Sequence, residues 1–145
     1  MYTSDMNENK NRALRTAAIY LGVSLFTALF GAIYERFSHE VYSYFMIYAF
    51  AFPLAGGVLP FFLLGTVKTK RYPNTVLRYL FHAGIATLTV GSIMKGVLDI
   101  YGTTNSLTNF YWFAGIPMVI LPVFIFSLPE KKAEEKRNEA ALSWT

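Results

Sequence analysis

The feature that most constrains this chain is a long uncharged segment in its second quarter. After Glu40 no charged residue occurs until Lys68, and the stretch between them is rich in Phe, Leu, Ala and Gly. A helix needs about 20 predominantly apolar residues to cross the hydrocarbon core of a bilayer. A helix that is apolar on every side needs to be buried, either in a large core or in lipid. The segment therefore predicts a membrane-spanning helix.

Three further apolar runs accompany this segment. Together they predict four membrane helices at about residues 16–35, 41–66, 75–101 and 108–128. Charged residues make up 15% of the chain, against roughly 25% in soluble domains, as a lipid-facing surface requires. We expect an all-α polytopic membrane protein, one domain in which four transmembrane helices form an antiparallel bundle.

The cations are distributed unevenly among the polar segments. Lys and Arg concentrate before the first expected helix, in the loop between the second and third, and after the fourth, whereas the other two loops contain only Arg36. Cytoplasmic loops carry the excess of Lys and Arg in membrane proteins. Both termini and the middle loop are therefore expected in the cytoplasm, with the chain multi-pass in the bacterial cytoplasmic membrane.

Of the polar tails, residues 1–12 are expected to be disordered or frayed. Residues 130–145 are expected to be either frayed or a short helix on the membrane surface.

Small residues at helical spacing indicate two packing faces. They are Ser24, Ala28 and Gly31 on the first helix, and Gly84 and Gly91 on the third. Small residues let membrane helices approach closely, because lipid provides no hydrophobic force that pushes helices together. We expect both faces to contact other helices, and favour a contact with each other.

Four ionisable residues near the non-cytoplasmic ends of these helices form a candidate site: Glu35, His39, Lys95 and Asp99. Lys95 lies inside its helix, and Asp99, four residues on, lies on the same face. Glu35 reaches the same level if the two helices are adjacent. Two interpretations stay open, a structural ion pair and a proton, ion or substrate site, since ionisable residues within a membrane mark functional sites by default.

Metal and cofactor sites are not predicted. Glu35, His39 and Glu40 offer a carboxylate and imidazole cluster, but a strong metal site needs three or four defined ligands. His82 is expected to be hydrogen-bonded near the cytoplasmic surface. Its alternative role as a haem ligand would require a second histidine at the same depth, and His39 belongs to the opposite leaflet.

The second helix contains Pro53 and Pro60 with Gly56-Gly57 between them. Proline removes a backbone donor and kinks a helix, so freed carbonyls need partners on neighbouring helices. The kink is either tightly packed or a hinge.

Because the chain has no phosphate-binding or nucleophile motif and no cysteine, the expected function is a non-enzymatic membrane subunit that assembles with itself or with a membrane partner. A small oligomeric transporter or channel, and a membrane redox or haem protein, are the alternatives. The lipid bilayer is an expected partner, and nucleic acid is not.

The stretches IYERFSHEVYSYFMIYAFAFPLAGG and GVLDIYGTTNSL resemble small four-helix membrane proteins of Gram-positive bacteria. The resemblance covers the first three expected helices and implies the same fold, but brings no activity or functional residue. The chain also resembles small multidrug transporters in its length and number of helices. Those proteins have an essential glutamate in the middle of the first helix, whereas Glu35 stands at the end of that helix here.

Overall fold

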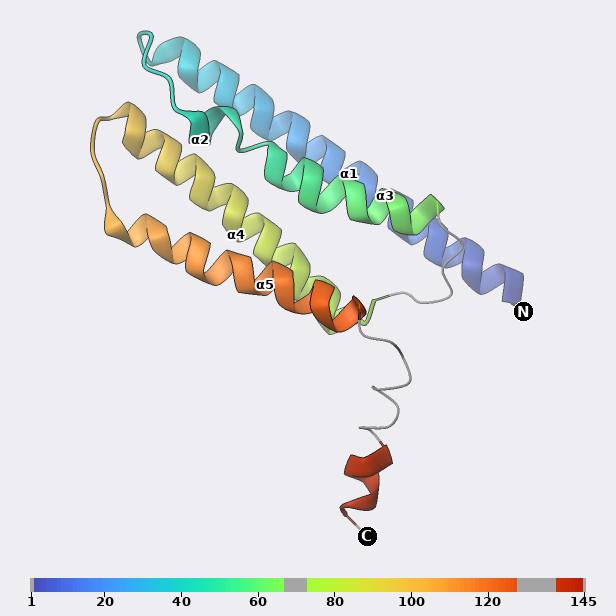
Figure 1. Cartoon of the computed structure of the whole chain (residues 1–145). Helices are drawn as coiled ribbons and strands as arrows, with labels where there is room; N and C mark the ends of the chain where they lie inside the picture. Colours follow the sequence, from blue (N-terminus) through green and yellow to red (C-terminus); the bar gives the residue numbers. More distant parts are fainter. Residues whose placement is uncertain (1, 67–72, 128–137, 145) are drawn as a thin grey trace.

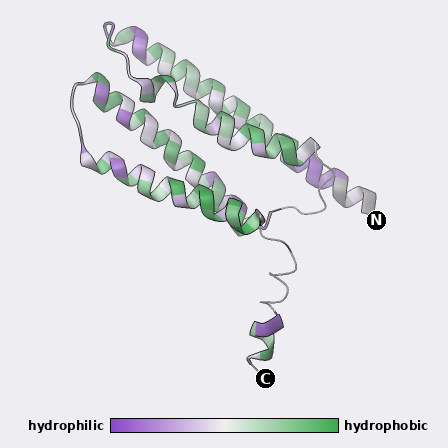
Figure 2. Cartoon of the chain, viewed as in Figure 1, coloured by the Kyte–Doolittle hydropathy of each residue, from purple (hydrophilic) through white to green (hydrophobic). Residues whose placement is uncertain are grey.

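The computed structural model describes residues 2–66, 73–127 and 138–144. Throughout these ranges the regular secondary structure is helical, with no strand. Four helices are long and apolar enough to cross a membrane, namely Asn7–Phe37, Tyr44–Thr66, Thr75–Ile100 and Ser106–Ser127. Figure 2 shows how hydrophobic residues extend along all four of them. The prediction of an all-helical chain with four such helices is confirmed.

The first helix, α1, extends over Tyr2–Phe37 and is longer than the predicted first span. The sequence predicts a disordered or frayed tail over residues 1–12, but the structure continues the helix into that segment from its second residue. Glu8 and Arg12 form an ion pair one turn apart, and the Thr16 hydroxyl donates a hydrogen bond to the Arg12 carbonyl oxygen. Such contacts, and the low cost of extending an existing helix, favour helix in this polar segment.

The second span is divided, although the sequence predicts one helix over 41–66. It consists of α2 (Tyr44–Ile47), a π-helical segment η1 (Phe52–Val58) and α3 (Leu59–Thr66). Pro53 is the second residue of η1, where a widened helix accommodates a residue that cannot donate a backbone hydrogen bond. The irregularity was expected near the prolines, but its π-helical form was not.

Hydroxyl groups from two other helices bond to the irregular part of the second span. Ser92 donates a hydrogen bond of 2.7 Å to the Phe45 carbonyl oxygen, and Ser24 donates one of 3.1 Å to the Phe50 carbonyl oxygen. Both serines are buried, as is Pro53. An irregular backbone in lipid needs such partners, and their presence favours the packed kink over the hinge.

The last two spans agree with the prediction to within one residue at each end. They are α4 (Thr75–Ile100) and α5 (Asn109–Ser127). The Asn74 side chain caps α4 by accepting a hydrogen bond from the next backbone N–H. Before α5, Asn105 accepts one from the N–H two residues on and begins the short 3-10 turn η2 (Ser106–Thr108).

Residues 138–142 form a short helix in the tail. Their side chains are exposed, and the segment lies apart from the four spans in Figure 1. Positions 130–137 of the expected tail, and Lys68, Lys70 and Arg71 of the basic loop, lie outside the described residues.

The spans lie side by side in a row that follows their order in the sequence (Figure 1). α1 packs on η1 and α3, α2 and η1 pack on α4, and α4 packs on α5. α4 is the most buried of the four and α5 the least. The turns at residues 38–43 and 101–105 lie at one end of the row, which we name the turn end.

Both small-residue faces contact other helices, as predicted, but they contact different neighbours and do not meet each other. A side chain at Gly31 would contact Met46 of the second span, while side chains at Gly84 and Gly91 would contact Val119 and Tyr111 of α5. The hydrogen bond from Ser24 to Phe50 also joins the small-residue face of α1 to the second span. Ala28, on the same face, is partly buried. Helical periodicity shows which face is small but not which neighbour it meets.

Candidate functional site

The candidate site at the turn end contains a pair of opposite charges on α4. Lys95 Nζ donates a hydrogen bond of 3.0 Å to Asp99 Oδ1, and the two residues are one helical turn apart. Their side chains are 26% and 29% exposed. The Lys95 ammonium also lies 5.7 Å from the centre of the Phe45 ring, within the range of a cation–π attraction.

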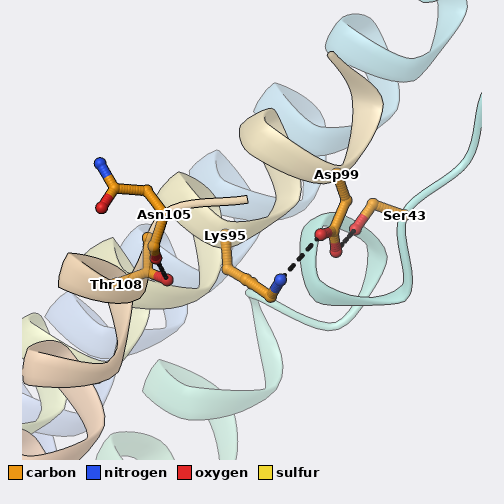
Figure 3. A network of polar contacts seen from close by, with 5 residues as sticks. All are labelled: Ser43, Lys95, Asp99, Asn105 and Thr108. Carbon is orange, nitrogen blue, oxygen red and sulfur yellow. Dashed lines mark hydrogen bonds and ion pairs between the residues drawn. The ribbon is translucent and has the colours of Figure 1, made fainter. Parts of the chain in front are cut away.

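Ser43 connects this pair to the second span. Its hydroxyl donates a hydrogen bond of 3.2 Å to Asp99 Oδ2, so Asp99 accepts from two different elements (Figure 3). Ser43 directly precedes α2 and is only 3% exposed. Ser43 could not be identified as a site residue from the sequence, because a serine at the start of an apolar helix is ordinarily interpreted as a helix cap. The pair therefore fixes the end of α4 to the start of the second span.

Two glycines make room for the turn that carries Ser43. A Cβ atom at Gly31 of α1 would lie 3.1 Å from the Met46 carbonyl oxygen. One at Gly96 of α4 would lie 2.8 Å from the Met46 backbone nitrogen. Met46 is 1% exposed. α2 thus sits between α1 and α4 at close backbone distance, and this places Ser43 beside Asp99.

Glu35 is not the partner of Lys95 in the described structure. Its Oε1 atom is buried and has no hydrogen-bond partner among the described residues. The sequence left open whether Asp99 or Glu35 pairs with the lysine, and the structure places Lys95 with Asp99. A buried carboxylate oxygen without a donor costs free energy. Within the described residues no hydrogen bond offsets this cost at Glu35 Oε1.

His39 and Glu40 lie in the turn after α1 and are exposed. Both have positive φ angles, 54° and 69°, which L residues rarely adopt. The Ser38 hydroxyl lies within hydrogen-bond distance of the Glu35 and Val41 carbonyl oxygens, and its single proton is donated to one of them at a time. Because α1 ends at Phe37, the helical alignment of Glu35 with His39 does not form. Within the described residues no three His, Asp or Glu side chains come close enough to hold a metal ion.

A cavity of about 460 Å³ opens at the turn end between α1 and α4. Aromatic side chains form much of its wall, among them those of Phe30, Tyr34, Phe37 and Tyr101, and His39 also lines it. Of the predicted site residues only His39 lines it. Tyr34 and Tyr101 could not be predicted as neighbours, because Tyr34 stands on α1 and Tyr101 directly follows α4.

His82 occupies a different place, nearer the other end of α4. Its Nδ1 atom and the Tyr20 hydroxyl are 2.6 Å apart, and its ring stacks on Phe61 at a centroid distance of 5.2 Å. The histidine therefore connects α4 to α1 and α3. Gly57 of η1 leaves room for the Tyr20 ring, which a side chain there would overlap. The expected hydrogen bond at His82 is present, with a partner 62 positions away in sequence.

No known protein family model matches this chain, and comparisons with characterised proteins and with solved structures found no match. Its function is therefore inferred from its own residues and their geometry.

Proposed function

We propose that the chain is a small non-enzymatic integral membrane protein that acts as a subunit, assembling with itself or with a membrane partner. Its four helices cross the bacterial cytoplasmic membrane with successive spans antiparallel, and both ends of this sequence face the cytoplasm. The uneven distribution of Lys and Arg supports this orientation. The turn end then faces outward.

The observation that carries the subunit role is the open row of spans. α1 and α5 occupy its two edges, and neither is enclosed by the other spans. Each edge presents large apolar side chains, among them Leu25, Phe26 and Leu29 on α1 and Phe113, Ile120 and Phe124 on α5. Lipid covers such surfaces, and a second chain of matching shape covers them with better packing. An open row therefore offers two edges for assembly.

The polar groups inside the spans support the same proposal, because they are used within the chain. Four buried hydroxyl groups each donate to a backbone carbonyl oxygen, those of Ser24, Thr27, Thr89 and Ser92. Lys95 pairs with Asp99, and His82 with Tyr20. The bonds of Ser24, Ser92 and His82 join different helices and stabilise their contacts. Those of Thr27, Thr89 and Lys95 lie within one helix. Groups engaged in either way are poorly placed to exchange with a moving ion.

A second candidate is a small oligomeric transporter, and Glu35 favours it. One oxygen of the carboxylate is buried and has no hydrogen-bond partner in the part of the chain that the structure describes, and it lies at the same end of the molecule as the aromatic cavity. Intramembrane ionisable groups commonly mark transport paths. Ion flux into vesicles containing the protein would favour this candidate, and flux unchanged by Glu35→Gln would exclude Glu35 as its site.

Haem ligation by two histidines of one chain has less support, because His39 lies in the turn after α1 and His82 nearer the opposite end of α4.

The mass of the protein in native membrane patches tests the subunit role. Patches extracted with an amphipathic polymer, without detergent, and analysed by native mass spectrometry should contain more than one polypeptide. The protein mass should exceed the 16.4 kDa of one chain, either as a multiple of it or with a second protein. Phe113→Ala and Phe26→Ala, at exposed positions on the two edges, should identify which edge is used by lowering that mass. A particle of one chain alone contradicts the subunit proposal.

A further inference from the structure

An apolar cavity of about 170 Å³ lies between α3, α4 and α5 at the end of the row away from the turn end. Its wall includes Phe61 and Leu64 of α3, Leu77 and Phe81 of α4, and Val123 and Phe126 of α5. Every residue that lines it except Arg78 is apolar, and an apolar space of this size favours hydrocarbon over water. The chemistry that this space accepts is therefore a hydrocarbon segment.

The cavity is accessible from the surface that faces lipid. Val123, which forms part of its wall, is 51% exposed. Figure 2 shows α5 strongly hydrophobic around this region. In a membrane the hydrocarbon at this surface consists of lipid acyl chains, so an acyl chain is the available occupant.

A positively charged side chain lies in the wall of the same cavity. Arg78 is the one charged residue in its described wall and lies in the first turn of α4. The guanidinium carbon lies 5.8 Å from the centre of the Tyr79 ring. The N-terminus of a helix adds partial positive charge, which falls off within its first turn. The charge complements an anionic headgroup, and Arg matches phosphate oxygens well.

We propose that this cavity and Arg78 form a binding site for an anionic phospholipid, with one acyl chain in the cavity and the phosphate at the guanidinium. The proposal goes beyond the subunit role. It requires that the chain lies in a membrane, but not that it assembles. A single class of ligand carries both required features, an acyl chain and a negative headgroup at the membrane interface.

Lipid retention in nanodiscs of equal parts phosphatidylglycerol and phosphatidylcholine tests the site. When the protein is released from the disc in a native mass spectrometer, phosphatidylglycerol should be retained about fivefold more than phosphatidylcholine, the equivalent of about 1 kcal/mol for one interfacial cation. Arg78→Gln should bring the ratio close to one, and Arg78→Lys should restore most of it. Val123→Trp should reduce retention of both lipids by filling the cavity. Arg36→Gln, at an exposed cation in the last turn of α1 at the turn end, is the charge-matched control and should leave the ratio unchanged.

Three results would overturn the proposal. Equal retention of the two lipids by the natural chain would show that the headgroup is not recognised. A ratio unchanged in Arg78→Gln would show that the charge acts elsewhere, and this variant tests the site even if Val123→Trp does not fold. Displacement of the lipid by glycerol 3-phosphate at equal concentration would assign the site to free phosphate. None of these readouts depends on the number of chains per particle, so they are separable from failure of the subunit proposal.

Discussion

Gly84→Leu is expected to destabilise the protein severely. A Cβ atom at this position would lie 2.7 Å from Val119 Cγ2 and 2.9 Å from the Met118 backbone carbon. The backbone of α5 cannot move away without separating the two helices along the interface that gives α4 much of its burial. Overpacking of this kind costs typically 1–3 kcal/mol, and contact with backbone atoms places the expected loss near 3 kcal/mol. Thermal unfolding in detergent should show a large fall in Tm.

The matched control is Gly22→Leu, which introduces the same side chain on α1. No heavy atom other than those of its own local backbone lies within 4 Å of a Cβ atom at Gly22. The change should therefore alter stability by less than about 0.5 kcal/mol. Equal losses from both substitutions would mean that α4 and α5 do not meet at Gly84.

Asp99→Asn is expected to produce the second large loss. It leaves the Lys95 charge uncompensated and weakens the bond to Ser43, which connects α4 to the second span. Breaking a fully buried pair costs about 3–5 kcal/mol. Because each side chain keeps about a quarter of its surface exposed, solvent screening lowers the expected loss to about 1–2 kcal/mol. The measurement is thermal unfolding in the same detergent.

A double-mutant cycle identifies the partner of the lysine. Lys95→Met should recover part of the loss in Asp99→Asn, because the uncompensated charge is then gone. The matched cycle combines Lys95→Met with Glu35→Gln and should be additive, since Glu35 does not bond to Lys95 in the structure. Additivity in both cycles would refute the ion pair, and coupling to Glu35 alone would reassign it.

Much of the fold could be predicted from particular residues. The uncharged segment between Glu40 and Lys68 favours a membrane span, because a chain of 145 residues offers no core large enough to enclose four such helices. Asn74 and the polar residues after Tyr101 set the ends of α4 to within one residue. The contact of Lys95 with Asp99 was also predictable, since a spacing of four on one helix places the two side chains together.

The remaining features depend on contacts between distant segments. Helical spacing marked Gly84 as a packing residue, but α5 as its neighbour follows only from the fold. His82 and Asp99 stood out in the sequence, but their partners Tyr20 and Ser43 did not, because each partner lies far away along the chain. The π-helical form of η1 depends on how Pro53 is accommodated between α1 and α4, where serines of both helices bond to irregular backbone.

The arrangement in the membrane is the central claim, and cysteine accessibility in intact cells tests it most directly. The chain has no cysteine, so each substitution introduces a single reactive group. Asn105→Cys, at the turn end, should react with a membrane-impermeant thiol reagent. Asn74→Cys and Ser143→Cys should react only after the cells are opened. Labelling of position 74 from outside, or equal labelling at all three positions, would contradict a four-span chain with both ends in the cytoplasm.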